Sequence, residues 1–221
     1  MRRSVDLRKL IDRHLTVMMA RLGFVREKRG MYRSSLGTDV VGIATFPEKL
    51  WAGVKWECFP NVGVRHDGVN RLLCELSNLS KSDRSLGLLR ANLITNIGYL
   101  TPARSHRAWS FPFNTDPEPA ARDMIATIET YGLPFIRILF AGRTFREVLA
   151  SGRYSLASQD RDLPALYFVE GDYGAAENYL RASLEKRTNR HDPEAEQYRM
   201  FAARLHELIL AHKEGTRGPE L

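Results

Sequence analysis

The chain has 221 residues, of which 43% are hydrophobic and 27% are charged, a composition typical of a globular protein and too apolar for a wholly disordered one. Its two cysteines, Cys58 and Cys74, lack the dense spacing of a secreted disulfide scaffold, so we expect buried thiols. No stretch approaches the roughly 18 consecutive apolar residues of a membrane span, and the basic start contains acids, which argues against a signal peptide. We therefore expect no membrane association and a cytoplasmic location.

The formal net charge of +7 is concentrated at the start of the chain. Residues 1–33 hold ten bases and three acids, and the remaining 23 bases and 23 acids cancel. A local excess of this kind predicts one basic face, because a generally basic protein would spread its charge along the chain.

The first predicted element is a helix over residues 4–22, with Ser4 as a possible N-cap and Gly23 just past its end. Arg8, Lys9 and Arg13 fall off its apolar stripe and should face solvent or a partner. The apolar residues at helical spacing are Leu7, Leu10, Ile11, Leu15, Met18 and Leu22.

Short runs rich in aromatic and β-branched residues follow and predict an antiparallel meander. The expected strands are Met31–Arg33, Val40–Phe46 and Trp51–Phe59, and the last should place Ala52, Val54, Trp56 and Cys58 on one face. The connecting turns are expected at Leu36–Asp39 and Pro47–Lys49.

A helix opening at Asp67 or Gly68 and ending before Ser80–Ser85 should separate this meander from two further strands, Asn92–Leu100 and Arg107–Phe113. The order of elements predicts an α+β domain over residues 1–150, with an antiparallel sheet within about 24–113 and helices on one face of the sheet.

After Phe113 the pattern becomes helical. Thr115 or Asp116 should cap a helix that ends near Gly132, and a shorter helix should include Phe145, Val148 and Leu149. We expect a linker at 151–162, a helical hairpin with a terminal helix at 163–214, and a frayed tail at 215–221. Within the hairpin, Gly171-Asp172-Tyr173 resembles the turn of a tetratricopeptide repeat. The sequence leaves open whether this hairpin binds a peptide or only packs.

No motif predicts a catalytic, metal or cofactor site. Cys58 and Cys74 are too far apart for a zinc knuckle, and the dipeptides His66-Asp67 and His191-Asp192 each precede a helix, where we expect Asp to be the cap. The chain contains neither a Gly-x-Ser-x-Gly elbow nor a phosphate-binding glycine loop. A hydrolase with a spatially assembled site remains the enzymatic alternative.

Binding is the better supported class of function. An acidic protein partner would complement the basic amino-terminal region, while nucleic acid is an alternative ligand, and a merely solvated face is a third interpretation. The segment around Trp109 adds three polar candidates near a turn. The candidate partner-binding residues are Arg8, Lys9, Arg13, Arg26, Lys28, Arg29, Arg104, His106 and Arg107.

The order of features over residues 7–150 resembles uncharacterised bacterial domain-of-unknown-function proteins of the kind found near toxin, immunity or mobile-element genes. The features are Leu22-Gly23-Phe24, Tyr32-Arg33, a Trp-bearing strand, Trp109-Ser110-Phe111 and Tyr131-Gly132-Leu133-Pro134. The resemblance implies an immunity- or antitoxin-like interaction protein of a bacterial conflict system, and it implies no catalytic residue.

Overall fold

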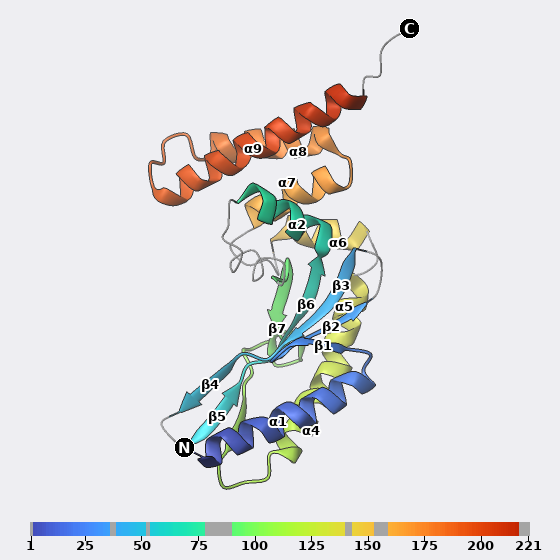
Figure 1. Ribbon diagram of the computed structural model, residues 1–221, viewed down its shortest axis with the longest axis vertical. Helices are drawn as coiled ribbons and strands as arrows, with labels where there is room; N and C mark the ends of the chain where they lie inside the picture. The colour runs from blue at the N-terminus through green and yellow to red at the C-terminus, as the bar shows by residue number, and fades with distance from the viewer. Residues whose placement is uncertain are drawn as a thin grey trace. The chain divides into compact units, whose positions relative to one another are not determined.

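The computed structural model describes residues 2–35, 39–51, 54–77, 90–139, 143–152 and 159–216 (Figure 1). The chain divides into two compact units, each built from two stretches of sequence. Unit 1 is Met1–Arg65 with Leu93–Val148, and unit 2 is His66–Asn92 with Leu149–Leu221. Antiparallel strands with helices, followed by a helical carboxy-terminal region, confirm the predicted α+β fold. None of the described helices is long and apolar enough to cross a membrane.

Unit 1 begins with α1 (Arg2–Arg21), which ends just before Gly23 at φ +83°. Its buried stripe is Ile11, Leu15 and Met19, spaced one helical turn apart. The sequence-based stripe was wrong about Leu10, whose side chain is 37% exposed. Apolar residues on both flanks of the true stripe make its centre ambiguous in the sequence.

A five-stranded sheet forms the centre of unit 1, in the order β1-β2-β3-β6-β7. The strands are β1 (Val25–Lys28), β2 (Met31–Ser35), β3 (Val40–Thr45), β6 (Asn61–His66) and β7 (Leu93–Asn96). The pairs β1–β2, β2–β3 and β6–β7 are antiparallel. Tyr32 on β2 is fully buried, stacks edge-on against Phe46, and its hydroxyl lies 3.1 Å from Thr16 Oγ1 of α1. The hydrogen bond therefore joins α1 to the sheet, and the contact with Phe46 holds the Tyr32 ring in place.

A three-stranded sheet in the order β4-β5-β8 contains β4 (Glu48–Trp51), β5 (Lys55–Cys58) and β8 (Trp109–Pro112). The predicted single strand at Trp51–Phe59 was wrong, because Trp51 pairs with Lys55 and closes a hairpin. Val54 is 65% exposed at that hairpin instead of sharing a buried face with Cys58, and Ala52 lies outside the described residues. The predicted turn at Pro47–Lys49 was also wrong, since β4 begins at Glu48.

Beyond β7 the backbone departs from the predicted strand at Asn92–Leu100. β7 stops at Asn96, and η1 (Ile97–Leu100) is a 3₁₀ helix that the Asn96 side chain caps. The helical segment after β8 comprises α4 (Glu118–Thr127), η2 (Ile128–Gly132, a π-helical turn), α5 (Leu133–Leu139) and α6 (Arg143–Ser151). The helix predicted to end near Gly132 thus continues through a π turn into α5.

In the described part of unit 2, four helices pack together: α2 (Asp67–Leu76), α7 (Gln159–Val169), α8 (Tyr173–Glu185) and α9 (Pro193–Thr216). α7 begins at Gln159, so residues 159–162 of the expected linker are helical, while 153–158 lie outside the described residues. The same holds for the expected helix break at Ser80–Ser85, the turn at 36–38 and the tail beyond Thr216. The side chains that form the core of this unit include Leu166, Leu180, Phe201, Leu205 and Ile209.

Candidate partner-binding surface

The positive charge follows the two units. Unit 1 contains 19 bases and 11 acids, a balance of +8, whereas unit 2 contains 14 bases and 15 acids, a balance of −1. The basic character predicted for the first 33 residues is therefore a property of unit 1, and the question is which of its bases face outward.

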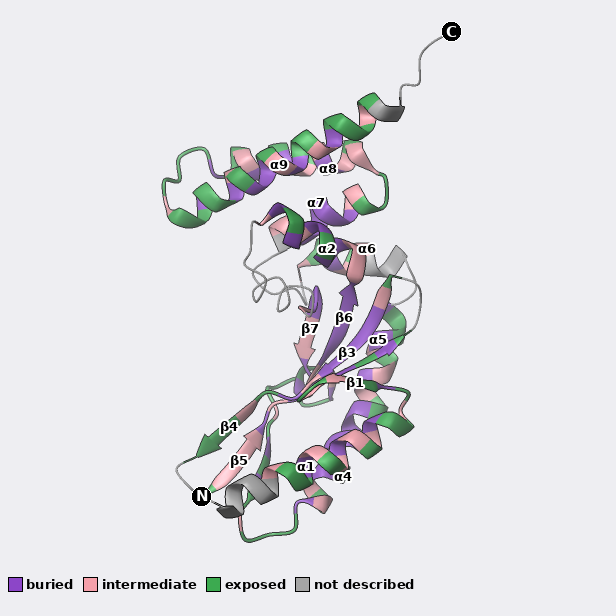
Figure 2. Ribbon diagram, viewed as in Figure 1, coloured by how far each residue is buried: buried purple, intermediate pink, exposed green. Residues whose placement is uncertain are grey.

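The outer side of α1 carries a mixed basic and aliphatic surface that we call the α1 face. Its members are Lys9, Leu10, Arg13, Val17 and Arg21, all exposed. They lie opposite the buried stripe of Ile11 and Leu15, because positions three, four and seven apart share one side of a helix. Figure 2 shows exposed and buried residues in alternating bands along α1. Among the described residues, the basic members of the α1 face form no ion pair.

Arg8, also predicted to bind a partner, has a different role. Its Nε lies 2.6 Å from Glu48 Oε2, and its guanidinium lies 4.8 Å from the centre of the Trp56 ring. Both contacts join α1 to the β4–β5 hairpin. The carboxylate and the aromatic ring hold the Arg8 cation within unit 1. Arg8 therefore contributes less to an outward-facing basic surface than its charge suggests.

The bases of the β1–β2 hairpin also differ in whether they form an ion pair. Arg26 pairs with Asp12 of α1 at 2.8 Å, which ties β1 to the helix. Lys28 and Arg29 are exposed at the turn and form no ion pair with any other described residue. Lys28 and Arg29 are therefore available to a partner as unneutralised charges, as is the exposed Arg33 of β2.

A turn region between η1 and β8 holds the remaining three predicted residues. The Asn96 side chain organises it: Oδ1 accepts hydrogen bonds from the N–H groups of Gly98 (3.0 Å) and Arg107 (2.9 Å), and Nδ2 donates to the carbonyls of Pro60 and Arg107. Asn96 is only 6% exposed. A buried side chain with four hydrogen bonds makes the loop rigid.

This rigid loop presents two of its three predicted residues to solvent. Arg104 adopts φ +44°, an unusual value for a non-glycine residue, and His106 is exposed with its ring 5.5 Å from that of Phe59. Arg107 instead pairs with Asp123 at 2.8 Å and stacks 4.3 Å from the centre of the Trp109 ring. Arg104 and His106 are thus surface residues, while Arg107 fastens the loop to α4.

The β4–β5 hairpin is a surface that the sequence did not indicate. β4 is an edge strand, and its Leu50 and Trp51 side chains are 48% and 41% exposed; Figure 2 shows β4 as exposed. Trp51 Nε1 donates to Glu57 at 2.5 Å, and Lys49 Nζ lies 3.8 Å from the centre of the Trp51 ring. The sequence-based prediction that one long strand begins at Trp51 missed this exposed edge.

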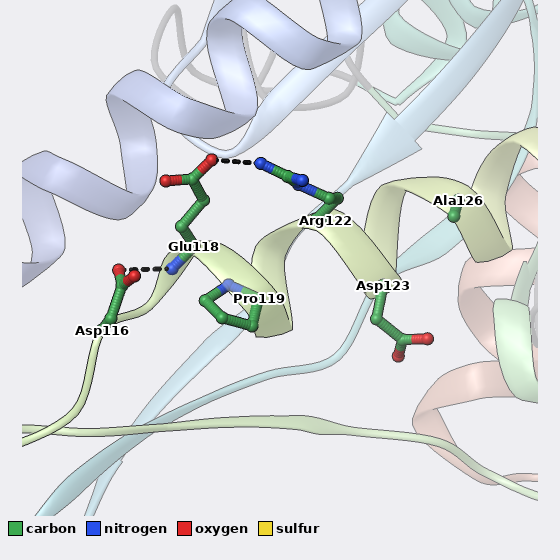
Figure 3. Close-up of a pocket in the computed structure, with 6 residues that line it drawn as sticks. All are labelled: Asp116, Glu118, Pro119, Arg122, Asp123 and Ala126. Carbon is green, nitrogen blue, oxygen red and sulfur yellow. Dashed lines mark hydrogen bonds and ion pairs between the residues drawn. The ribbon is translucent and has the colours of Figure 1, made fainter.

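A hollow of about 530 Å³ beside α4 is lined by three carboxylates, a residue type that could serve an enzyme (Figure 3). Each of these carboxylates already has a hydrogen-bond or ion-pair partner nearby. Asp116 accepts from the Glu118 N–H at 3.0 Å, Glu118 pairs with Arg122, and Asp123 accepts from Trp109 Nε1. Within the described ranges, no cluster of three His, Cys, Asp or Glu residues could hold a metal ion. The hollow therefore gives no basis for assigning catalysis.

The residues with possible enzymatic chemistry also have structural roles. His66, and not Asp67 as predicted, caps α2, with Nδ1 accepting from the Val69 N–H; Asp192 caps α9 through the Ala195 N–H as predicted. Cys58 and Cys74 are buried free thiols, which confirms that prediction. Burial raises the pKa of the Cys58 thiol well above its ordinary value, which keeps it protonated and unreactive.

Comparison of the chain with protein families, curated proteins and solved structures found no match. The feature that stands out is the α1 face, because there bases without described ion partners surround exposed aliphatic side chains.

Proposed function

We propose that the protein is a non-catalytic binding module that captures an acidic protein partner through the α1 face, in the manner of an immunity or antitoxin-like protein. One observation carries this proposal: Lys9, Arg13 and Arg21 lie on the solvent side of a core helix and form no ion pair with any described residue. Helix residues that only keep a protein soluble are commonly paired with acids three or four positions away. Arg13 and Arg21 have no acid three or four positions away along α1. Of the two acids three positions from Lys9, Asp12 pairs with Arg26 and the Asp6 side chain lies outside the described residues.

The aliphatic residues favour a protein over a nucleic acid as the partner. Leu10 is 37% exposed and Val17 is 51% exposed, and their spacing of seven residues places them on one line along the helix. Protein interfaces combine an apolar centre with a charged rim, whereas contacts to a phosphate backbone come from cations and other hydrogen-bond donors. A partner helix with an apolar stripe flanked by carboxylates would match the α1 face.

The test is affinity capture from a lysate of the native host with a charge-reversal variant. Lys9→Glu combined with Arg13→Glu should abolish capture of an acidic protein while leaving the thermal unfolding curve nearly unchanged, since both side chains are exposed. Arg8 is kept, because its loss would disturb the Glu48 and Trp56 contacts. The matched control, Arg33→Glu with Arg137→Glu, makes the same change in net charge at two other exposed positions of unit 1.

Two results would contradict the proposal. Equal capture by the wild type and by the Lys9→Glu and Arg13→Glu variant would show that the α1 face is not the binding surface. Retention on double-stranded DNA that falls steeply with salt, and that the same two substitutions abolish, would identify a nucleic-acid ligand instead, because each phosphate contact releases counterions.

A further inference from the structure

A second surface lies in unit 2, where α8 and α9 border a groove of about 640 Å³. Leu180 and Leu184 of α8 and Ala202 and Ala203 of α9 line it with apolar atoms. Leu180 and Ala202 are nearly buried, while Ala203 is exposed. The groove therefore has an apolar floor that is open to a ligand along the two helices.

Some of the charged residues that line the groove form ion pairs, and others do not. Glu177 pairs with Lys213 at 2.8 Å, and Arg199 pairs with Glu196 at 2.9 Å. Arg181 on α8 also lines the groove, is exposed, and forms no ion pair with any described residue. His206 on α9 is likewise exposed and lines the groove. The groove thus has Arg181 and an imidazole beside its apolar floor, and the one carboxylate among its lining residues, Glu177, is engaged by Lys213.

The packing of unit 2 indicates what shape of ligand fits. α7, α8 and α9 are consecutive helices that each contact the other two, as in a helical repeat stack. The next helix of such a stack would lie over α8 and α9, and stacks end with a polar face when nothing follows. Here the face is mixed, with an apolar floor between charged side chains, and Leu210, 44% exposed, continues the line of Ala203 and His206 along α9. Small residues such as Ala203 let another helix approach closely.

We propose that the groove between α8 and α9 binds an amphipathic helix of a partner protein that carries carboxylates beside its apolar face. Its leucines would pack on Leu180, Leu184 and Ala203, as in other helix-in-groove complexes. Its carboxylates would reach Arg181 and His206 on either side of the floor. From Glu177 to Leu184 the groove follows α8 for about 10 Å, or two helical turns. This surface is separate from the α1 face, and neither proposal depends on the other.

The probe is a displayed library of 16-residue helical peptides with leucines at positions i, i+4, i+7 and i+11. The positions that flank the leucines carry Glu, Gln or Lys. The full-length protein should enrich the Glu peptides about tenfold or more over the Lys peptides, as expected for a favourable against an unfavourable charge contact. Arg181→Glu should remove this preference. Lys186→Glu, the same charge change on the opposite side of α8, should leave it intact.

Ala203→Trp provides a second variant at an exposed position, where a larger side chain fills the groove without entering the core. It should abolish enrichment of all three classes, and an unchanged melting temperature would show that the fold is retained. The proposal is overturned if no class is enriched, or if Glu and Lys peptides are enriched equally by the wild type. It is also overturned if the protein forms a dimer that Ala203→Trp dissociates, because the occupant would then be a second copy of the chain.

Discussion

Replacing Asn96 with alanine tests whether one buried amide supports the loop that presents Arg104 and His106. The side chain makes four hydrogen bonds of 2.9–3.2 Å and is 6% exposed. A hydrogen bond contributes about 1 kcal/mol net, and a buried donor left without a partner costs more. Water can satisfy part of what the truncation exposes, so we expect Asn96→Ala to lower the free energy of unfolding by about 3 kcal/mol.

The control is Asn61→Ala, because Asn61 lies directly opposite Asn96 in the β6–β7 ladder. Its side chain makes one long hydrogen bond, 3.5 Å to Thr45 Oγ1, and its loss should cost less than about 1 kcal/mol. Urea denaturation measures both, and hydrogen exchange at residues 97–107 should accelerate only in Asn96→Ala. If the two variants lose equal stability, the four hydrogen bonds do not support the loop and the reasoning fails.

Two further predictions concern a cap and a pair of glycines. Arg190 and the Ala195 N–H hold the pKa of Asp192 down to about 2, below its unfolded value of about 4, so its stabilising contribution is present above pH 4 and is lost as pH falls toward 2. The stability difference between the wild type and Asp192→Ala should therefore shrink over that interval, and a difference independent of pH would contradict the role assigned to the carboxylate. Gly63→Ala places a Cβ 1.9 Å from the Leu93 carbonyl oxygen and should cost more than about 3 kcal/mol in thermal unfolding. Gly174→Ala in α8 has open space and should stabilise by up to about 1 kcal/mol; equal effects of the two substitutions would refute this interpretation.

The parts of the fold that the sequence predicted are those with a strong period or a terminating residue. The helical periods of α1 and α2 were clear, although the centre of the α1 stripe was not. Gly171-Asp172-Tyr173 marked the turn before α8, and Asp192 marked the start of α9. The strand prediction around Trp51 was wrong because alternating apolar residues look the same in one long strand and in a hairpin. Only the pairing of Trp51 with Lys55, a tertiary fact, distinguishes the two.

The sequence predicted only part of the candidate binding surface, because it shows neither which bases form ion pairs nor which aliphatic side chains are exposed. Sequence identifies Arg8, Lys9 and Arg13 as bases off the apolar stripe, but it does not contain the position of Glu48, forty residues away, which pairs with Arg8. Leu10 and Val17 were missed as surface residues because a helix with apolar positions on both sides has no unique inner face in the sequence. Tertiary structure decides which bases are neutralised and which aliphatic residues are exposed.

The two binding proposals can be tested separately, because the structure distinguishes bases that form ion pairs from bases that form none with a described residue. Arg8, Arg26 and Arg107 are each fastened to an acid of unit 1 at 2.6–2.8 Å, so substituting them would change both folding and charge. Lys9 and Arg13 on α1, like Arg181 on α8, form no ion pair with a described residue, so their reversal changes charge with little effect on folding. Because the α1 face and the groove belong to different units, loss of one interaction with retention of the other would show two independent ligands. Joint loss would show one partner that requires both.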